Sequence, residues 1–569
     1  MTAPVFSQRA PSRRWLASLV FTAVLAACGS DEESTPLSEG LAHAKSCRLL
    51  QHGKVVTDPA SSTTAQALVV CDEKIVAVGS DAELGYLSTR IETLDLGGRT
   101  VVPGINDAHV HVLASPGVPL NTAAFAPGPG PTLSEVLALI QAGAQQQPAG
   151  TWLVVAVGSA LVDDAATIRQ TLDTVSPDHP VLLKVWSGHG TYINTRAITA
   201  LGWSTTQPDP FGGHLGRLAG SDELNGVVYE YAEHQLNRKL FEGQTDAQLA
   251  QVYRDFAAQA IRLGYTSLTD IALGLPLERQ LRVLALADLP LRVRALCFPL
   301  TPQEPCDAPV PTAARERITA TGFKWITDGS PVERGAYLES PYSDLLSTQG
   351  FFNFEQTTLE TMLGKALTGS AVANQAVIHA VGDGAVDHVL AAAQQVGGAA
   401  AWQGKRLRIE HGDLIFPRHY ATLKDLGAIV VQNPIHLALP DMLHARVGPE
   451  RAEHAQPLKS LLAQGIPLAF GTDTIGQVES PWLDIFFAAV HPTTPSEAIS
   501  VPQAVAAYTR GSAYAENEEG RKGKIAVGML ADLAVLSQDV FSVDVNTVPA
   551  TQSVLTMVGG QVVWRATGF

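Results

Sequence analysis

Eight short runs of apolar residues recur between residues 101 and 472, and Ala- and Leu-rich stretches of helical character separate them. Parallel strands that are buried on both faces give such runs, and their alternation with helices favours βαβ units. The runs cover residues 101–112, 265–271, 291–298, 322–327, 375–379, 407–411, 428–432 and 467–472. We therefore predict an α/β fold in which residues 101–523 form a (β/α)8 TIM-like barrel.

Two parts of the chain do not fit a plain barrel. Residues 113–260, between the first two runs, are too many for one βα unit, so we expect a large insertion above the barrel mouth. Its aromatic residues either line a pocket or fill the core of the insertion: Trp152, Trp186, Tyr192, Trp203 and Phe211. Residues 46–100 and 524–569 alternate short β-branched runs with turn residues, which predicts a small antiparallel β-sandwich built from both chain ends.

The first residues have the pattern of a secretory signal peptide over residues 1–27. Arg9, Arg13 and Arg14 precede an apolar stretch over residues 15–27, which is too short to span a membrane. The sequence LAACG around Cys28 resembles a lipobox, which predicts lipidation of Cys28 and a polar tether over residues 28–45; an ordinary signal peptide with a chance cysteine is the alternative. We expect an exported bacterial lipoprotein that is anchored to a membrane, with its body in the periplasm or outside the cell.

Composition limits the partners of the chain. The 569 residues carry a net charge of −16, and no long run of Lys or Arg is present, which argues against nucleic acid. Four cysteines follow Cys28, and an oxidising compartment permits the pairs Cys47–Cys71 and Cys297–Cys306, although free buried thiols are an open alternative.

Polar side chains close several of the apolar runs. His109 and His111 lie two residues apart, so both rings project to the same side of a strand and can share one metal ion. His379, His411 and Asp473 each end a later run, where barrel active sites are built. A single buried histidine usually bonds a backbone carbonyl, but four histidines and an aspartate at strand ends match the ligands that zinc uses.

Lys324 lies inside the fourth run, where an unpaired cation would be costly to bury. The lysine points outward, or it pairs with Asp328, or its neutral amine reacts with carbon dioxide to form a carbamate that bridges two metal ions.

These motifs together resemble the amidohydrolase superfamily, and specifically the branch that includes N-substituted formamide deformylases. The resemblance runs from about Cys47 to Trp564, through VVPGINDAHVHV, SGHGTYINTRAI, FKWITDGSPVERGAYLESPY, VIHAVGDGAVDHVL, RIEHGDLI and FGTD. It implies a barrel with an appended sandwich and two divalent metal ions, with zinc as the default. It also implies that His109 and His111 bind one ion, that His379 and His411 bind the other, that carboxylated Lys324 bridges them, and that Asp473 binds the first ion and shuttles the proton.

The resemblance also suggests residues that contact the substrate. His189 is implied as a catalytic residue and Asn194 as a substrate-binding residue, the two being candidates for polarising the carbonyl or holding the acyl group. Arg334 is a further substrate-binding candidate, and Gln432 and His436 are weaker ones. Turn formation is the alternative for His189 and Asn194.

The expected reaction is hydrolysis of a non-peptide C–N bond, an amide or N-formyl group of a small molecule, by a metal-bound hydroxide. Related mononuclear deaminases carry a Glu three residues after the fifth-strand histidine, where this chain has Gly382, which disfavours a base deaminase. Hydrolysis of a lactone, ester or carbamate on the same binuclear site is the alternative, and a non-catalytic binding lipoprotein is a third possibility. The substrate and the oligomeric state are left open.

Overall fold

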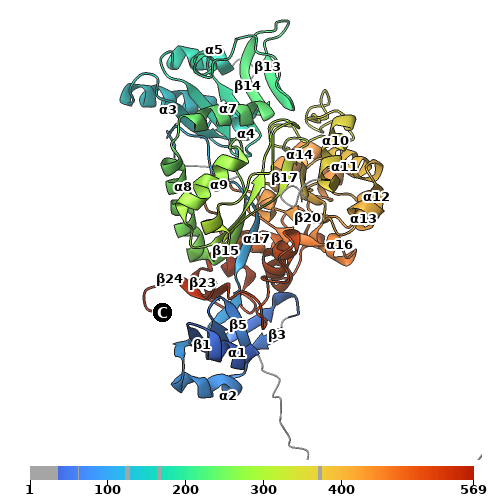
Figure 1. Ribbon diagram of the computed structural model, residues 1–569. Helices are drawn as coiled ribbons and strands as arrows, with labels where there is room; N and C mark the ends of the chain where they lie inside the picture. The colour runs from blue at the N-terminus through green and yellow to red at the C-terminus, as the bar shows by residue number, and fades with distance from the viewer. Residues whose placement is uncertain (1–35, 62, 122–127, 164–167, 369–374) are drawn as a thin grey trace, which may run out of the picture.

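The computed structural model describes residues 36–61, 63–121, 128–163, 168–368 and 375–569. The expected signal peptide and Cys28 lie outside the described residues. Three bodies follow one another in space, with the insertion at one end, the barrel in the middle and the small sandwich at the other end (Figure 1). Among the described helices, none is long and apolar enough to cross a membrane.

The barrel consists of eight parallel strands that are neighbours in chain order. They are β8 (Ile105–Val110), β15 (Tyr265–Ile271), β16 (Arg292–Cys297), β17 (Ile318–Ile326), β18 (Ala376–Ala380), β19 (Arg408–His411), β20 (Ile429–Gln432) and β21 (Leu468–Phe470). Each of the eight apolar runs contains or overlaps one of these strands, so the predicted α/β barrel is confirmed. The first run is divided, because its beginning forms β7 (Thr100–Pro103) in the sandwich.

The barrel closes between its last strand and its first through a short set of backbone bonds. The Asp473 amide donates to the carbonyl of His109 over 2.8 Å, and the His111 amide donates to Thr474 over 2.9 Å. A Cβ atom at Gly471 would lie 2.5 Å from the backbone nitrogen of His109, so only glycine permits this approach. The seam therefore brings the end of β21 against the histidines of β8.

Helices cover the outside of the barrel. They include α8 (Asp246–Leu263), α9 (Leu277–Ala287), α10 (Gln356–Thr368), α11 (Asp383–Gln395), α13 (Pro417–Leu426), α16 (Leu458–Ala463) and α17 (Pro481–Val490). The helix α8 shows how the sequence sets the bounds: Thr245 and Gln248 form a capping box at its start, and Gly264 ends it in the left-handed region. Because α8 packs on α9 as a barrel helix, the insertion ends earlier than the expected residue 260.

Two sheets form the sandwich. The first has the order β5 (Lys74–Gly79), β4 (Ala67–Cys71), β1 (Cys47–Gln51), β6 (Glu92–Asp95); the second has the order β24 (Gln561–Arg565), β23 (Ser553–Val558), β22 (Leu533–Leu536), β7, β2 (Lys54–Asp58), β3 (Thr63–Ala65). Residues from both chain ends, such as Leu50, Val101, Leu533 and Leu555, share one core. Most neighbouring strands pair antiparallel, as expected, but β1 pairs with β6 and β2 pairs with β7 in parallel.

Both cysteine pairs are bonded, Cys47 with Cys71 and Cys297 with Cys306. The last part of the expected tether over residues 28–45 is not an extended linker. Residues of α1 (Pro36–His43) are helical, and Leu37 packs against a hydrophobic cluster of the sandwich. The contact of Leu37 and the close approach of Gly40 to Val76 hold this helix against the sandwich.

The insertion is a six-stranded sheet with flanking helices. Its strand order is β13 (Gly213–Arg217), β14 (Leu224–Glu230), β12 (Gly190–Ile193), β11 (Val181–Val185), β10 (Leu153–Val157), β9 (Val118–Pro119), and its helices include α3 (Leu133–Gln146), α5 (Ile168–Val175), α6 (Thr195–Ala200) and α7 (Tyr231–Glu242). Tyr192, Trp152 and Trp203 pack in its two cores, whereas Phe211 stacks on Phe354 from the barrel side. Most of its aromatic residues therefore fill cores.

Candidate metal centre

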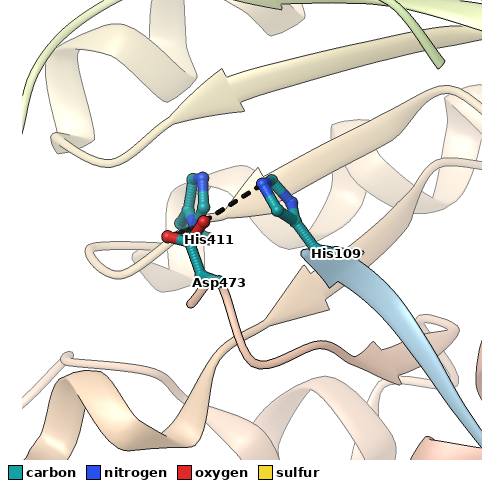
Figure 2. Close-up of side chains that lie close together, drawn as sticks. All are labelled: His109, His411 and Asp473. Atoms are coloured by element: carbon teal, nitrogen blue, oxygen red, sulfur yellow. Dashed lines mark ion pairs between the residues drawn. The ribbon is translucent and has the colours of Figure 1, made fainter. Parts of the chain in front are cut away.

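Three side chains from distant parts of the chain meet at the C-terminal mouth of the barrel. His109 comes from β8, His411 ends β19, and Asp473 follows β21. One ligand atom from each side chain lies within 4.8 Å of the other two, and Figure 2 shows the carboxylate close to both rings. The distance from His109 Nε2 to Asp473 Oδ1 is 3.2 Å. Two imidazoles and a carboxylate in this arrangement can hold a divalent metal ion.

The other predicted ligands lie beside this group. His111 Nε2 is 3.0 Å from Asp473 Oδ1, and Lys324 Nζ is 3.5 Å from His109 Nε2. The rings of His379 and His411 have centroids 4.5 Å apart. All six side chains line one small hollow, which we call the inner chamber; its lining is His109, His111, Ser187, Gly188, His189, His234, Leu273, Lys324, Ile326, His379, His411, Asp473 and Ile475.

Hydrogen bonds on the far side of the rings fix the orientation of three histidines. Nδ1 of His109 bonds the Glu410 carboxylate over 2.6 Å, and Nδ1 of His111 donates to the Ile271 carbonyl over 2.8 Å. Nδ1 of His411 lies 2.8 Å from Asn433 Oδ1. With Nδ1 of each ring engaged in this way, Nε2 is the nitrogen that a metal ion would use, which is the usual arrangement around histidine ligands.

Burial controls the charges in the chamber. It lowers the pKa of Lys324 to about 8, so roughly a tenth of the amine is neutral at neutral pH, far more than for an exposed lysine. Burial, reinforced by the Lys324 charge, lowers the pKa of His109 to about 4, so this ring is neutral and can act as a ligand. Burial alone would raise the pKa of Asp473, but the surrounding histidines hold it well below its usual value. His109 and Asp473 are therefore in the protonation state that metal binding requires.

The position of Lys324 excludes two of the three alternatives for this residue. Its side chain is 1 % exposed, and its amine faces His109, so it does not point outward. Asp328 instead accepts three backbone amides, from Val381, Gly382 and Tyr337. No ion pair links these two side chains among the described contacts.

Three residues at the chamber have a strained backbone. His411, Asp473 and Glu230 have φ angles of 66°, 57° and 55°, in the left-handed region that residues other than glycine rarely adopt. Such conformations persist only where the surrounding structure imposes them, and they cluster at functional sites.

His189 reaches the chamber from the insertion. Its Nδ1 lies 2.9 Å from Glu230 Oε1, and its ring centroid is 4.6 Å from that of His379. Burial would lower the pKa of His189, but the Glu230 charge and hydrogen bond outweigh burial and raise it to about 9. Asn353 donates to the other oxygen of Glu230. The ring is therefore a positioned cation at the mouth of the chamber.

A larger hollow, which we call the outer pocket, opens next to the inner chamber. It shares Ser187, His189, His379, His411, Asp473 and Ile475 with that chamber. The rest of its lining is Trp186, Ser330, Pro331, Val332, Val381, Asp413, Ile435, His436, Leu437, Met442, Leu443, Ala455, Gln456, Thr472, Thr474, Gln477 and Glu479. This lining is largely apolar and contains no lysine or arginine. Of the insertion's aromatic residues named above, Trp186 is the one that lines the outer pocket.

The weaker candidate His436 is part of the outer pocket. Its Nδ1 lies 2.9 Å from Asp413 Oδ2, and its Nε2 lies 3.4 Å from Asp473 Oδ2.

Three predicted substrate contacts lie outside both hollows. The Asn194 amide caps α6 and makes four bonds to backbone groups, so no donor or acceptor is left for a substrate. Arg334 is held in ion pairs by Asp163 and Asp344. Gln432 is fully buried and donates to the Gly412 carbonyl. The described structure thus argues against a direct substrate contact for each of the three.

Sequence reasoning missed the residues that support the ligands. Glu230, Glu410 and Asn433 orient His189, His109 and His411, and they come from other strands or loops. The sequence did contain one signal: Arg408 and Glu410 lie two residues apart in an apolar strand, and buried charges at this spacing must be paired.

A parallel barrel that gathers histidines, a lysine and an aspartate at the C-terminal ends of its strands has the architecture of metal-dependent TIM-barrel enzymes. The comparison with known families agrees with this class. The chain belongs to the amidohydrolase family, whose profile matches residues 92–564.

Relatives and solved structures show the same similarity over nearly the full chain. N-substituted formamide deformylase of Arthrobacter pascens is 27% identical over 556 residues, which cover 91% of this chain and 98% of that protein. The protein LONG AFTER FAR-RED 3 of Arabidopsis thaliana is 26% identical, covering 90% of this chain and 91% of that protein. An uncharacterized metal-dependent hydrolase from Pyrococcus horikoshii OT3 has the same fold, with a TM-score of 0.66, 22% identity and coverage of 88% and 99%.

Proposed function

We propose that this chain is a metal-dependent hydrolase that cleaves a C–N bond other than a peptide bond, in an amide or an N-formyl group of a small molecule. The observation that carries the proposal is the meeting of His109, His411 and Asp473 at the barrel mouth, beside the open outer pocket. Membership of the amidohydrolase family and the similarity to an N-substituted formamide deformylase support it.

The donor set fits two divalent ions, and we propose zinc. His109 and His111 would hold one ion together with Asp473, and His379 and His411 would hold the other. The buried amine of Lys324, whose pKa is lowered to about 8, is suited to form a carbamate that bridges the two. When bound, such ions lower the pKa of water to near 7 and polarise a substrate carbonyl.

The side chains around the ions divide the remaining tasks. Asp473 takes a proton from the attacking water and delivers it to the leaving nitrogen, first as a general base and then as a general acid. His189, held by Glu230, donates a hydrogen bond to the carbonyl oxygen as negative charge develops there. The C–N bond breaks, and the products are a carboxylate and an amine.

The test uses protein stripped of metal with a chelator and then reloaded with zinc. Both forms are assayed on a panel that contains a formamide, an acetamide and a carbamate of one amine, an ester of the corresponding alcohol, and a lactone. We expect the reloaded protein to hydrolyse a formamide or amide and the stripped protein to lose that activity. Hydrolysis of esters or lactones alone would show that the enzyme cleaves a C–O bond and not the proposed C–N bond. An inert reloaded protein that still binds two ions would favour a binding protein.

We also propose that the protein is exported and anchored to a membrane through a lipid on Cys28. The two disulfides support this location, because such bonds persist in oxidising compartments.

A further inference from the structure

His234 is a buried histidine that the proposed mechanism does not use. It lies on α7 and lines the inner chamber together with Leu273 and Ile326. Its side chain belongs to a residue that is 1 % exposed, and neither Nδ1 nor Nε2 has a hydrogen-bond partner in the protein. Phe298 and Tyr231 pack edge-on against the ring, with centroids 4.9 Å and 5.8 Å away. The packing fixes the ring while both nitrogen atoms stay unpaired.

An unpaired buried imidazole needs a physical reason. Burial holds the pKa of His234 well below its usual value, so the ring is neutral, with one N–H donor and one acceptor nitrogen. The charged neighbours Lys184 and Glu233 bond each other and not the His234 ring. A phenylalanine would fill the same space without two unpaired polar atoms, whose burial opposes folding. A partner for the ring can enter through the chamber that it lines.

The two hollows differ in size and in character. The inner chamber has a cavity volume of about 20 Å³, against about 90 Å³ for the outer pocket, and the proposed ions would take part of the smaller volume. In the proposed reaction the scissile carbon must lie next to the ligand side chains. The bulky leaving group therefore fits the apolar outer pocket, and only a short acyl group fits the inner chamber.

We infer that His234 hydrogen-bonds the acyl group of the substrate, and that the enzyme prefers short acyl groups that carry a hydrogen-bonding atom, such as carbamoyl or glycolyl, over apolar ones of the same size. The inference rests on the proposed function. A site with a buried polar group discriminates strongly against a ligand that leaves this group unpaired. His234 is thereby a specificity-determining residue.

The first experiment measures binding and needs no turnover. Glycolate and propionate have equal numbers of heavy atoms, and they are titrated calorimetrically into zinc-loaded protein. We expect glycolate to bind about 10- to 100-fold more tightly. The His234→Phe variant keeps the aromatic packing but removes both nitrogen atoms, so it should lose this preference through weaker glycolate binding. The His388→Phe variant, on the outer helix α11, serves as the matched control and should keep it.

The second experiment measures kcat/KM for a carbamoyl and an acetyl derivative of one amine. We expect the carbamoyl-to-acetyl ratio to fall at least tenfold in the His234→Phe variant, with metal content unchanged. A glycolate preference that survives in this variant would assign the effect to the ions and overturn the inference. Loss of an ion would overturn it as well, since His234 would then be a metal ligand.

Two further arms keep the test decisive. The His234→Leu variant replaces His234→Phe if the latter does not fold. If the wild-type protein hydrolyses nothing in the panel, the proposed function fails, and the glycolate and propionate titrations still decide whether His234 contacts an acid in the chamber.

Discussion

Replacing Glu410 with glutamine tests how the barrel supports its ligands. Glu410 and Arg408 are fully buried, and the Glu410 carboxylate accepts two bonds from Arg408 and one from His109. Burial alone would raise the pKa of Glu410, but the Arg408 guanidinium and the His109 ring hold it well below its usual value. The carboxylate is therefore charged in the folded protein, and glutamine keeps its size but removes that charge.

Two effects of the Glu410→Gln variant follow from these contacts. Breaking a buried ion pair by removing one partner leaves Arg408 uncompensated, so the free energy of unfolding should fall by about 3–5 kcal/mol. Loss of the carboxylate behind a histidine ligand makes the ring less basic, so zinc affinity should fall about 10- to 100-fold. Urea unfolding and competition with a fluorescent zinc chelator measure the two quantities.

The control is Glu519→Gln, which removes the partner of Arg406 in a more exposed pair far from the chamber. A surface pair contributes only about 0–1 kcal/mol, and zinc affinity should not change. Wild-type stability and zinc affinity in the Glu410→Gln variant would refute the argument that this carboxylate supports the metal centre.

Three more predictions follow from individual contacts. Lys324→Ala should lose about one metal ion per chain and most activity, with partial recovery in short carboxylates; two retained ions with full activity, by elemental analysis and rate measurement, would exclude the bridge. Glu230→Gln should lower kcat about tenfold with little change in metal content, because the charge that keeps His189 cationic is removed; an unchanged kcat would separate His189 from the reaction. Cys28→Ser should abolish lipid attachment, measured by mass spectrometry, whereas a protein that begins at Pro36 should keep wild-type kcat; an inactive but folded shortened protein would give residues before Pro36 a further role.

Most of the barrel could be predicted from the sequence, because strands buried on both faces leave apolar runs that need no knowledge of their partners. The ends of those runs located His379, His411 and Asp473 for the same reason. The split of the first run into β7 and β8 was missed, since both halves are equally apolar and the division depends on which sheet each half joins.

The supporting residues could not be predicted in the same way. Glu230 is 41 residues from His189, and Glu410 is 301 residues from His109, so these pairs exist only in the folded protein. Asn194 was assigned to the substrate because it shares a motif with His189, yet its amide caps a helix. A cap and a binding residue use the same polar atoms, and only the tertiary structure distinguishes them.

The central claim is that one carboxylate at the closing seam moves the proton while the other ligands hold the ions, and the Asp473→Asn variant tests it most directly. Asparagine keeps the size and one acceptor oxygen, tolerates the positive φ angle of 57°, and cannot accept a proton at neutral pH. Metal content and kcat are measured on the same preparation. The account predicts a modest loss of metal and a kcat lowered about 10²- to 10⁴-fold, with KM changing much less. A variant that keeps both its metal ions and near wild-type turnover would contradict it.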